Sequence, residues 1–209
     1  MCYSAQIQAS YRRYVRDFGA RISLERFIDL FWEKRRDGGW SKLPKAMRAA
    51  FEAPTNEGER AIADLIAAAE REQAGVFEAE MFQQNTRLTT AERTLATKPT
   101  KKAENDQRIA IDKISRAQRN LADLQRTELL PRDSRIFPGH YAPVLVVEHG
   151  QLTVIPMRYQ CRLPGWTAAM ERQKPGTYNA LGTLLTLDER ICFLIKYLGL
   201  ITLFSEFIE

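Results

Sequence analysis

Hydrophobic side chains recur at helical spacing through residues 7–51. Leu30 and Phe31 follow Phe27 by three and four positions, with charged residues interleaved, and this is the period of an amphipathic helix. The stretch Asp37-Gly38-Gly39 comes next, and glycine readily adopts the backbone conformation that ends a helix. The pattern predicts two or three short amphipathic helices in this segment.

Residues 57–128 differ because they are dense in Ala, Glu, Gln and Arg. Two apolar series follow coiled-coil spacing: Met81, Leu88 and Leu95, then Ala110, Ile114, Ala117, Leu121 and Leu124. Lys98-Pro99-Thr100-Lys101 interrupts the run once. This predicts an antiparallel helical hairpin with arms of about 40 and 28 residues, or about 60 and 40 Å at 1.5 Å per residue. Such an element is typical of a spacer or docking arm, so we expect a protein partner for it.

After Pro131 the chain turns to proline, glycine and β-branched residues. Residues 142–147 form an apolar run that ends at Glu148-His149-Gly150, and a second run follows at 152–157. This predicts two strands joined by a tight turn. A last apolar run, 191–204, contains Lys196 and falls short of the roughly 20 residues that a membrane span needs. We therefore expect a buried core segment there and no membrane partner.

The composition is that of a folded protein. Of 209 residues, 44% are hydrophobic and 27% are charged, which excludes a disordered or collagen-like chain. Three cysteines stand at no metal or redox spacing, and we find no secretory leader ahead of them. These features favour a reducing, cytoplasmic location.

Charge is unevenly distributed along the chain. The formal net charge is +5, and residues 1–56 alone hold 11 basic and 6 acidic side chains, which favours an anionic partner. Residues 57–130 are close to neutral, which argues against the hairpin as the main nucleic-acid surface. We expect an α+β protein of three parts: N-terminal helices in 1–56, the hairpin in 57–130 and a β-rich core in 131–209.

Cys2 carries the clearest candidate chemistry. Initiator methionine is readily removed before a small side chain, and removal would leave a thiol and an α-amine on one residue. Their ordinary pKa values are about 8.5 and about 8, so both nucleophiles are partly available near neutral pH. Such an aminothiol condenses with an aldehyde through a Schiff base that the thiol closes to a thiazolidine. The alternative is that Cys2 is a small residue at a frayed terminus.

Several short motifs occur in the order found in the SOS response-associated peptidase (SRAP) family. They are Met1-Cys2, Ala142-Pro143-Val144, Met157-Arg158-Tyr159, Leu163-Pro164-Gly165-Trp166, Tyr178-Asn179-Ala180 and Phe207-Ile208-Glu209. The chain therefore resembles an abasic-site processing protein. Residues 7–130 match nothing in compact members and resemble a lineage-specific helical insertion. The resemblance implies an SRAP-like β-rich core that is incomplete, as if truncated at its C-terminus, with the long hairpin inserted.

The resemblance also implies an activity. Cys2 would capture the aldehyde of an abasic site in single-stranded DNA as a covalent adduct that shields the lesion, with autoproteolytic removal of Met1. Asn179 would orient the N-terminus and the sugar, and Glu209 would act as general acid/base; no cofactor is implied. The residues expected to contact DNA are Pro143 and Trp166, with Arg158 and Arg162 beside them. An aromatic ring stacks on any base, and arginines neutralise phosphates.

The chain departs from the family at specific positions. Cys2-Tyr3-Ser4 replaces Cys-Gly-Arg, and Asn179-Ala180-Leu181 replaces Asn-Ala-Arg, so each motif loses an arginine. The family's catalytic histidine lies in a part of the domain that this sequence lacks. Neither His140 nor His149 stands in the matching motif, so the resemblance assigns no role to either.

Three other interpretations stay open. The chain is a non-catalytic remnant that acts as a helical protein-interaction module, which the truncation favours. Alternatively, Cys2 is the nucleophile of a glutamine amidotransferase, although no glycine-rich oxyanion loop follows it. A zinc site from Cys161, Cys192, His140 and His149 is disfavoured, because their spacing follows no zinc pattern.

Overall fold

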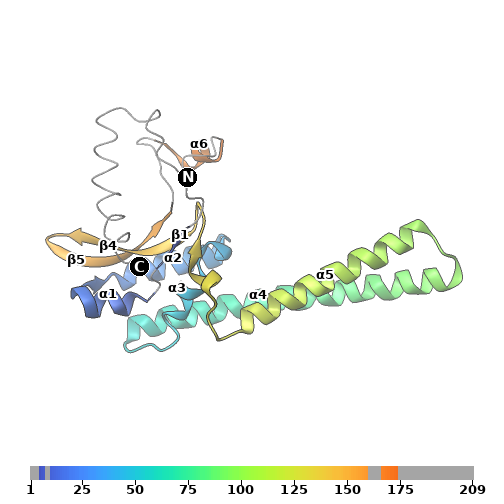
Figure 1. Ribbon diagram of the computed structural model, residues 1–209, viewed down its shortest axis with the longest axis horizontal. Helices are drawn as coiled ribbons and strands as arrows, with labels where there is room; N and C mark the ends of the chain where they lie inside the picture. The colour runs from blue at the N-terminus through green and yellow to red at the C-terminus, as the bar shows by residue number, and fades with distance from the viewer. Residues whose placement is uncertain (1–4, 8–9, 160–165, 174–209) are drawn as a thin grey trace. The chain divides into compact units, whose positions relative to one another are not determined.

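The computed structural model describes residues 5–7, 10–159 and 166–173 (Figure 1). The chain divides into two compact units. Unit 1 combines Met1–Ala63 with Leu130–Glu209, and unit 2 is Asp64–Leu129. The fold is mixed α and β, with a long helical hairpin and a small three-stranded sheet. The N-terminal helices and the strands that follow the hairpin therefore fold as one unit.

The short helices predicted for residues 7–51 are confirmed. They are α1 (Tyr11–Phe18), α2 (Leu24–Arg36), the 3-10 turn η1 (Trp40–Lys42) and α3 (Lys45–Ala49). Helix α2 ends where Gly38 and Gly39 take φ of 83° and 90°, a region that side chains with a Cβ rarely enter. The predicted stop at these glycines is confirmed as well.

Phe51, which is fully buried, lies at the centre of the unit 1 core. Its ring stacks on Tyr11 at 4.7 Å between centroids and meets Phe27 and Phe31 at 5.5 and 5.9 Å. Phe31 in turn meets Trp40 edge-on at 5.8 Å. Because aromatic side chains bury large areas, this cluster joins α1, α2 and the segment after α3.

The strands are β1 (Ala5–Gln6), β2 (Arg21–Ile22), β3 (Arg135–Ile136), β4 (Tyr141–Glu148) and β5 (Gln151–Arg158), with η2 (Pro131–Ser134) before β3 and α6 (Ala168–Gln173) last. Strands β4 and β5 are the predicted hairpin and pair antiparallel. At its turn, His149 and Gly150 both have positive φ, 52° and 77°, as a two-residue type I′ turn requires. Strand β2 joins the other edge of β5 in parallel, and β1 pairs antiparallel with β3. The two N-terminal strands were not predicted.

Helix α2 covers one face of the three-stranded sheet (Figure 1). On this face Lys34 lies over the ring of Tyr141, at 5.0 Å from its centroid. Side chains alternate between the two faces of a strand, so Pro143 shares the face of Tyr141. Opposite β4 on the same face stands Val154, which is fully buried. This packing fixes the register of β4 and β5, because a slip by one residue would reverse both faces.

A buried carboxylate ties α1 to the start of α4 (Glu57–Thr97). Glu59, with 3% of its surface exposed, accepts hydrogen bonds from the backbone N–H and hydroxyl of Thr55 at 2.7 and 2.9 Å. It also accepts from Arg12 at 3.2 Å. Burial alone would raise the pKa of Glu59, but the Thr55 bonds, with Tyr11 and Arg12, outweigh it and lower the pKa. Burial and the nearby Glu59 raise the pKa of Tyr11 to about 12, so its hydroxyl stays neutral.

Unit 2 is the predicted helical hairpin, made by α4 and α5 (Lys101–Gln125). Of the series predicted for α5, Ala110 and Ala117 are buried, and Ile114, Leu121 and Leu124 are half-buried. Ala103, which was not predicted, is buried seven positions before Ala110. On α4 the buried positions are Gln84 and Ala91, and the predicted Met81, Leu88 and Leu95 alternate with them, half-buried.

Polar contacts cross the hairpin seam at two levels. Arg87 bonds Asp106 at 2.5 Å, and Lys113 bonds Glu80 at 3.1 Å. Both pairs share one antiparallel register. Glu80 also accepts a hydrogen bond from the buried Gln84 at 3.1 Å. A polar side chain within a coiled-coil seam disfavours slipped pairings, because a slip leaves its groups unpaired.

Candidate functional site

Three segments that lie far apart in the sequence converge in unit 1. The N-terminal strand β1 pairs with β3, and Ile7 donates its backbone N–H to Ser134 at 2.9 Å. The loop 137–140 then leads from β3 into β4. Two backbone hydrogen bonds tie this loop to the residue after β5: Gly139 donates to Tyr159 at 2.8 Å, and Tyr159 donates to His140 at 2.7 Å. The loop is thus fixed between the N-terminal segment and the end of β5.

Gly139 allows this loop its shape. Its φ of 86° lies in the region that favours glycine. The turn is closed by a backbone hydrogen bond from His140 to Phe137 at 2.9 Å. The two rings meet edge-on, with 5.5 Å between centroids, so the imidazole is held on one side by an apolar neighbour.

His140 is the titratable group of this loop. Burial lowers its pKa, and the positive charge of Lys42 acts in the same direction. The imidazole is therefore neutral at physiological pH, and it can accept a proton. Its Nδ1 atom is buried and has no hydrogen-bond partner within the described part of the chain. The sequence motifs assigned His140 no role; the structure places it at the convergence of the three segments.

Cationic side chains surround the same region. Lys34 lies over Tyr141, and burial, which would lower its pKa, is outweighed by Glu33 and Tyr141, so the pKa is raised and the charge is retained. Arg158 stands directly opposite Tyr141 in the β4–β5 register and is half-buried. Lys34 is mostly buried and pairs with Glu33 at 2.8 Å, so Arg158 and the exposed Lys42 are the cations of this region that suit a phosphate.

The structure describes three of the predicted site residues. Arg158 ends β5, beside the converging segments. Trp166 is half-buried and stands shortly before α6. Pro143 is buried on the face that α2 covers, opposite Pro156, so its ring has little surface to offer a base in the free protein. The DNA contacts expected of these residues stay predictions.

The other predicted site residues, Cys2, Asn179, Glu209 and Arg162, lie outside the described residues. Their assignment rests on the motifs alone. Within residues 5–7, 10–159 and 166–173, no three His, Cys, Asp or Glu side chains gather in a way that could hold a metal ion. In that same part of the chain, no helix has the length and apolar character needed to cross a membrane.

Comparison with known proteins adds no relative. No protein-family model, no curated protein and no solved structure matches this chain. The resemblance to the SRAP family therefore rests on the order of the short motifs in the sequence.

Proposed function

We propose that the protein binds single-stranded DNA and captures the aldehyde of an abasic site at Cys2. The observation that carries the proposal is the pairing of β1 with β3, which ties the chain three residues after Cys2 to the strand before the 137–140 loop. Three extended residues span at most about 11 Å, so this pairing limits how far Cys2 lies from Ala5. That Cys2 reacts beside the 137–140 loop, and so beside His140, is part of the proposal.

The chemistry needs no cofactor and balances with water as its one by-product. The Cys2 amine attacks the aldehyde carbon, and the carbinolamine loses water to form an imine. The thiol sulfur then adds to the imine carbon while its proton passes to nitrogen, which closes the thiazolidine. His140, being neutral, suits the removal of a proton from the Cys2 ammonium before attack. Lys42 and Arg158 supply positive charge for the flanking phosphates.

The proposal is tested by intact mass spectrometry after incubation with single-stranded DNA that contains one abasic site. We expect an adduct whose mass is the sum of the Met1-free protein and the DNA, less one water. Cys2→Ser should form only an imine, which is lost on purification unless borohydride is added. DNA without the abasic site should leave the mass unchanged. An unreacted wild-type protein, or a stable adduct on the serine variant, contradicts the proposal.

His140→Gln separates the role of the loop from that of the nucleophile. This variant should slow adduct formation by on the order of a hundredfold, the usual scale of a general base, with the final mass unchanged. His149→Gln, in the exposed β4–β5 turn, is the matched control. Equal rates for both variants would exclude His140 from the reaction. A glutamine-analogue inhibitor that labels Cys2 while abasic DNA does not would favour the amidotransferase interpretation instead.

A further inference from the structure

Unit 2 is neutral as a whole, but its charges are segregated. We define the hairpin tip as residues 87–113, which include the ends of both helices where they are joined. The tip holds seven basic and four acidic side chains, whereas the rest of the unit, 64–86 and 114–129, holds four basic and seven acidic ones. The tip is therefore positive and the opposite end of the hairpin negative, a contrast that the near-neutral total conceals.

Ion pairs account for only part of the positive charge at the tip. Three cations have carboxylate partners in the hairpin: Arg87 with Asp106, Arg108 with Asp112, and Lys113 with Glu80. The other four are exposed and make no ion pair with any described residue: Arg93, Lys98, Lys101 and Lys102. Two further carboxylates remain at the tip, Glu92 and Glu104. An unneutralised excess of positive charge is thus exposed where the two helices meet.

Two of these lysines stand where local helix electrostatics disfavours them. Helix α5 begins at Lys101, and Thr100 caps it by accepting a hydrogen bond from Ala103 N–H at 3.2 Å. A cation in the first turn of a helix opposes the helix dipole. Lys101 and Lys102 therefore cost the hairpin some stability, and this points to a role outside the folding of α5.

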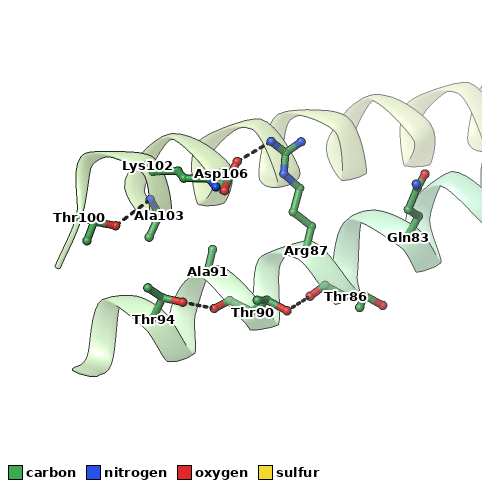
Figure 2. A pocket seen from close by; sticks show the side chains of 10 residues that line it. All are labelled: Gln83, Thr86, Arg87, Thr90, Ala91, Thr94, Thr100, Lys102, Ala103 and Asp106. Atoms are coloured by element: carbon green, nitrogen blue, oxygen red, sulfur yellow. Dashed lines mark hydrogen bonds and ion pairs between the residues drawn. The ribbon is translucent and has the colours of Figure 1, made fainter. Parts of the chain in front are cut away.

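A groove lies between the helices at the tip. It encloses about 490 Å³ and is lined by threonines of α4, with Lys102 on α5 and the Arg87–Asp106 pair (Figure 2). Thr90 and Thr94 donate their hydroxyl protons to carbonyls of their own helix. Of the large hydrophobic side chains exposed in the described part of the chain, Ile111 alone falls within the tip, with 47% of its surface exposed. A protein partner would find a single apolar anchor here, whereas a phosphate backbone needs only cations.

We propose that the hairpin tip is a second, sequence-independent contact for single-stranded DNA, made through the phosphate backbone. The choice of single-stranded DNA rests on the proposed function. The charge and exposure of the tip, and its single exposed apolar residue, are observations independent of the Cys2 chemistry. Because the contact would be made through the phosphate backbone, the tip would raise affinity for lesion-free and abasic strands alike.

The test is equilibrium binding of the full-length protein to lesion-free oligothymidylate, as a function of salt. Lys101→Glu/Lys102→Glu should weaken binding at low salt by on the order of tenfold. It should also reduce the slope of log affinity against log salt by about 1.4, since each phosphate contact on a single strand contributes about 0.7. Arg116→Glu/Arg119→Glu is the matched control, because it makes the same charge change at two exposed sites of α5 away from the tip. The arginine variant should lose no more than about twofold in DNA affinity, since salt screens the effect of charges that do not contact the DNA.

Several outcomes overturn the inference. Equal losses in the two double variants would show a general charge effect, and no loss in the lysine variant would exclude the tip. If the lysine variant lost binding to polyglutamate but bound DNA as tightly as the wild type, the partner of the tip would be an acidic protein and not DNA. Circular dichroism should show α5 intact in Lys101→Glu/Lys102→Glu, and melting should show no loss of stability, because the change favours the helix dipole.

The closing measurement separates this inference from the proposed function. At saturating abasic DNA, the lysine variant should reach the same final adduct yield as the wild type, whereas Cys2→Ala should form no thiazolidine but keep tip-dependent binding. If the wild type forms the adduct but the lysine variant binds DNA as tightly as the wild type, only the inference about the tip is wrong. If DNA binding depends on the tip lysines but no adduct forms, only the proposed function is wrong.

Discussion

The two units of this protein are stabilised in opposite ways. In unit 1, Phe51 contacts three aromatic rings, and Glu59 lies buried among polar partners. In unit 2, the buried positions of α5 are all alanine, and partly exposed ion pairs cross the seam. Large buried side chains make single positions decisive, whereas an alanine seam spreads a small apolar gain along many turns. A single core substitution should therefore strongly destabilise unit 1, whereas a single seam substitution should destabilise unit 2 only modestly.

The largest expected effect is at the centre of the unit 1 core. Phe51→Ala should lower the free energy of unfolding by about 3–5 kcal/mol, because it removes a fully buried ring and leaves a cavity. Urea denaturation followed by tryptophan fluorescence measures the loss. Phe82→Ala, at a ring with 78% of its surface exposed on α4, is the control and should change stability by less than about 0.5 kcal/mol. Similar losses of unfolding free energy for Phe51→Ala and Phe82→Ala would contradict the view that buried rings make single positions of unit 1 decisive.

The buried carboxylate gives an intermediate effect that depends on pH. Glu59→Gln should cost about 1–3 kcal/mol at pH 7, because the amide cannot accept all the bonds that the carboxylate accepts from Thr55 and Arg12. The pKa of Glu59 is lower in the folded protein than its unfolded value of about 4.3. The stabilisation is thus fully present above about pH 5 and is lost as the pH falls through the folded pKa.

The unfolding free energies of the wild type and of Glu59→Gln, measured from pH 7 down to pH 3, should therefore converge at low pH. Glu57→Gln, an exposed carboxylate in the same helical turn, is the control and should show a small, nearly constant difference. If the difference in unfolding free energy between wild type and Glu59→Gln grew as the pH fell, folding would raise the pKa of Glu59. That result would contradict the hydrogen bonds described above.

The most local effect is expected in the hairpin seam. Ala110→Leu should cost about 1–3 kcal/mol through overpacking at a fully buried position, and the loss should be confined to unit 2. Amide hydrogen exchange measures it locally, as lower protection in α4 and α5 with α1 and α2 unchanged. Ala122→Leu, on the exposed side of α5, should leave protection unaltered. Loss of protection throughout unit 1 would show that the two units unfold together.

The hairpin and the β4–β5 pair could be predicted because their signals are local. Seven-residue spacing and a single proline-containing break located α4 and α5, and an apolar run around His149-Gly150 located the two strands. Strands β1 and β2 have two residues each, too few for any period, and each depends on a partner more than a hundred residues away. Such pairings are decided by tertiary contacts, which a local pattern does not contain.

The candidate site was harder to predict, for the same reason. Pro143 was expected to contact DNA, but which face of β4 is covered follows from the packing of α2 and not from the motif. His140 drew no assignment, because its neutral state depends on burial and on Lys42, which comes from a distant segment. The motifs at Cys2 and Asn179 define a chemical hypothesis that the mass and binding experiments above decide.

The common register of the two seam ion pairs has an evolutionary consequence. Arg87 meets Asp106 and Glu80 meets Lys113 in one register, so a step forward along one arm corresponds to an equal step back along the other. Equal numbers of heptads can therefore be added to or removed from both arms, which would lengthen or shorten the hairpin while the register of its seam is preserved.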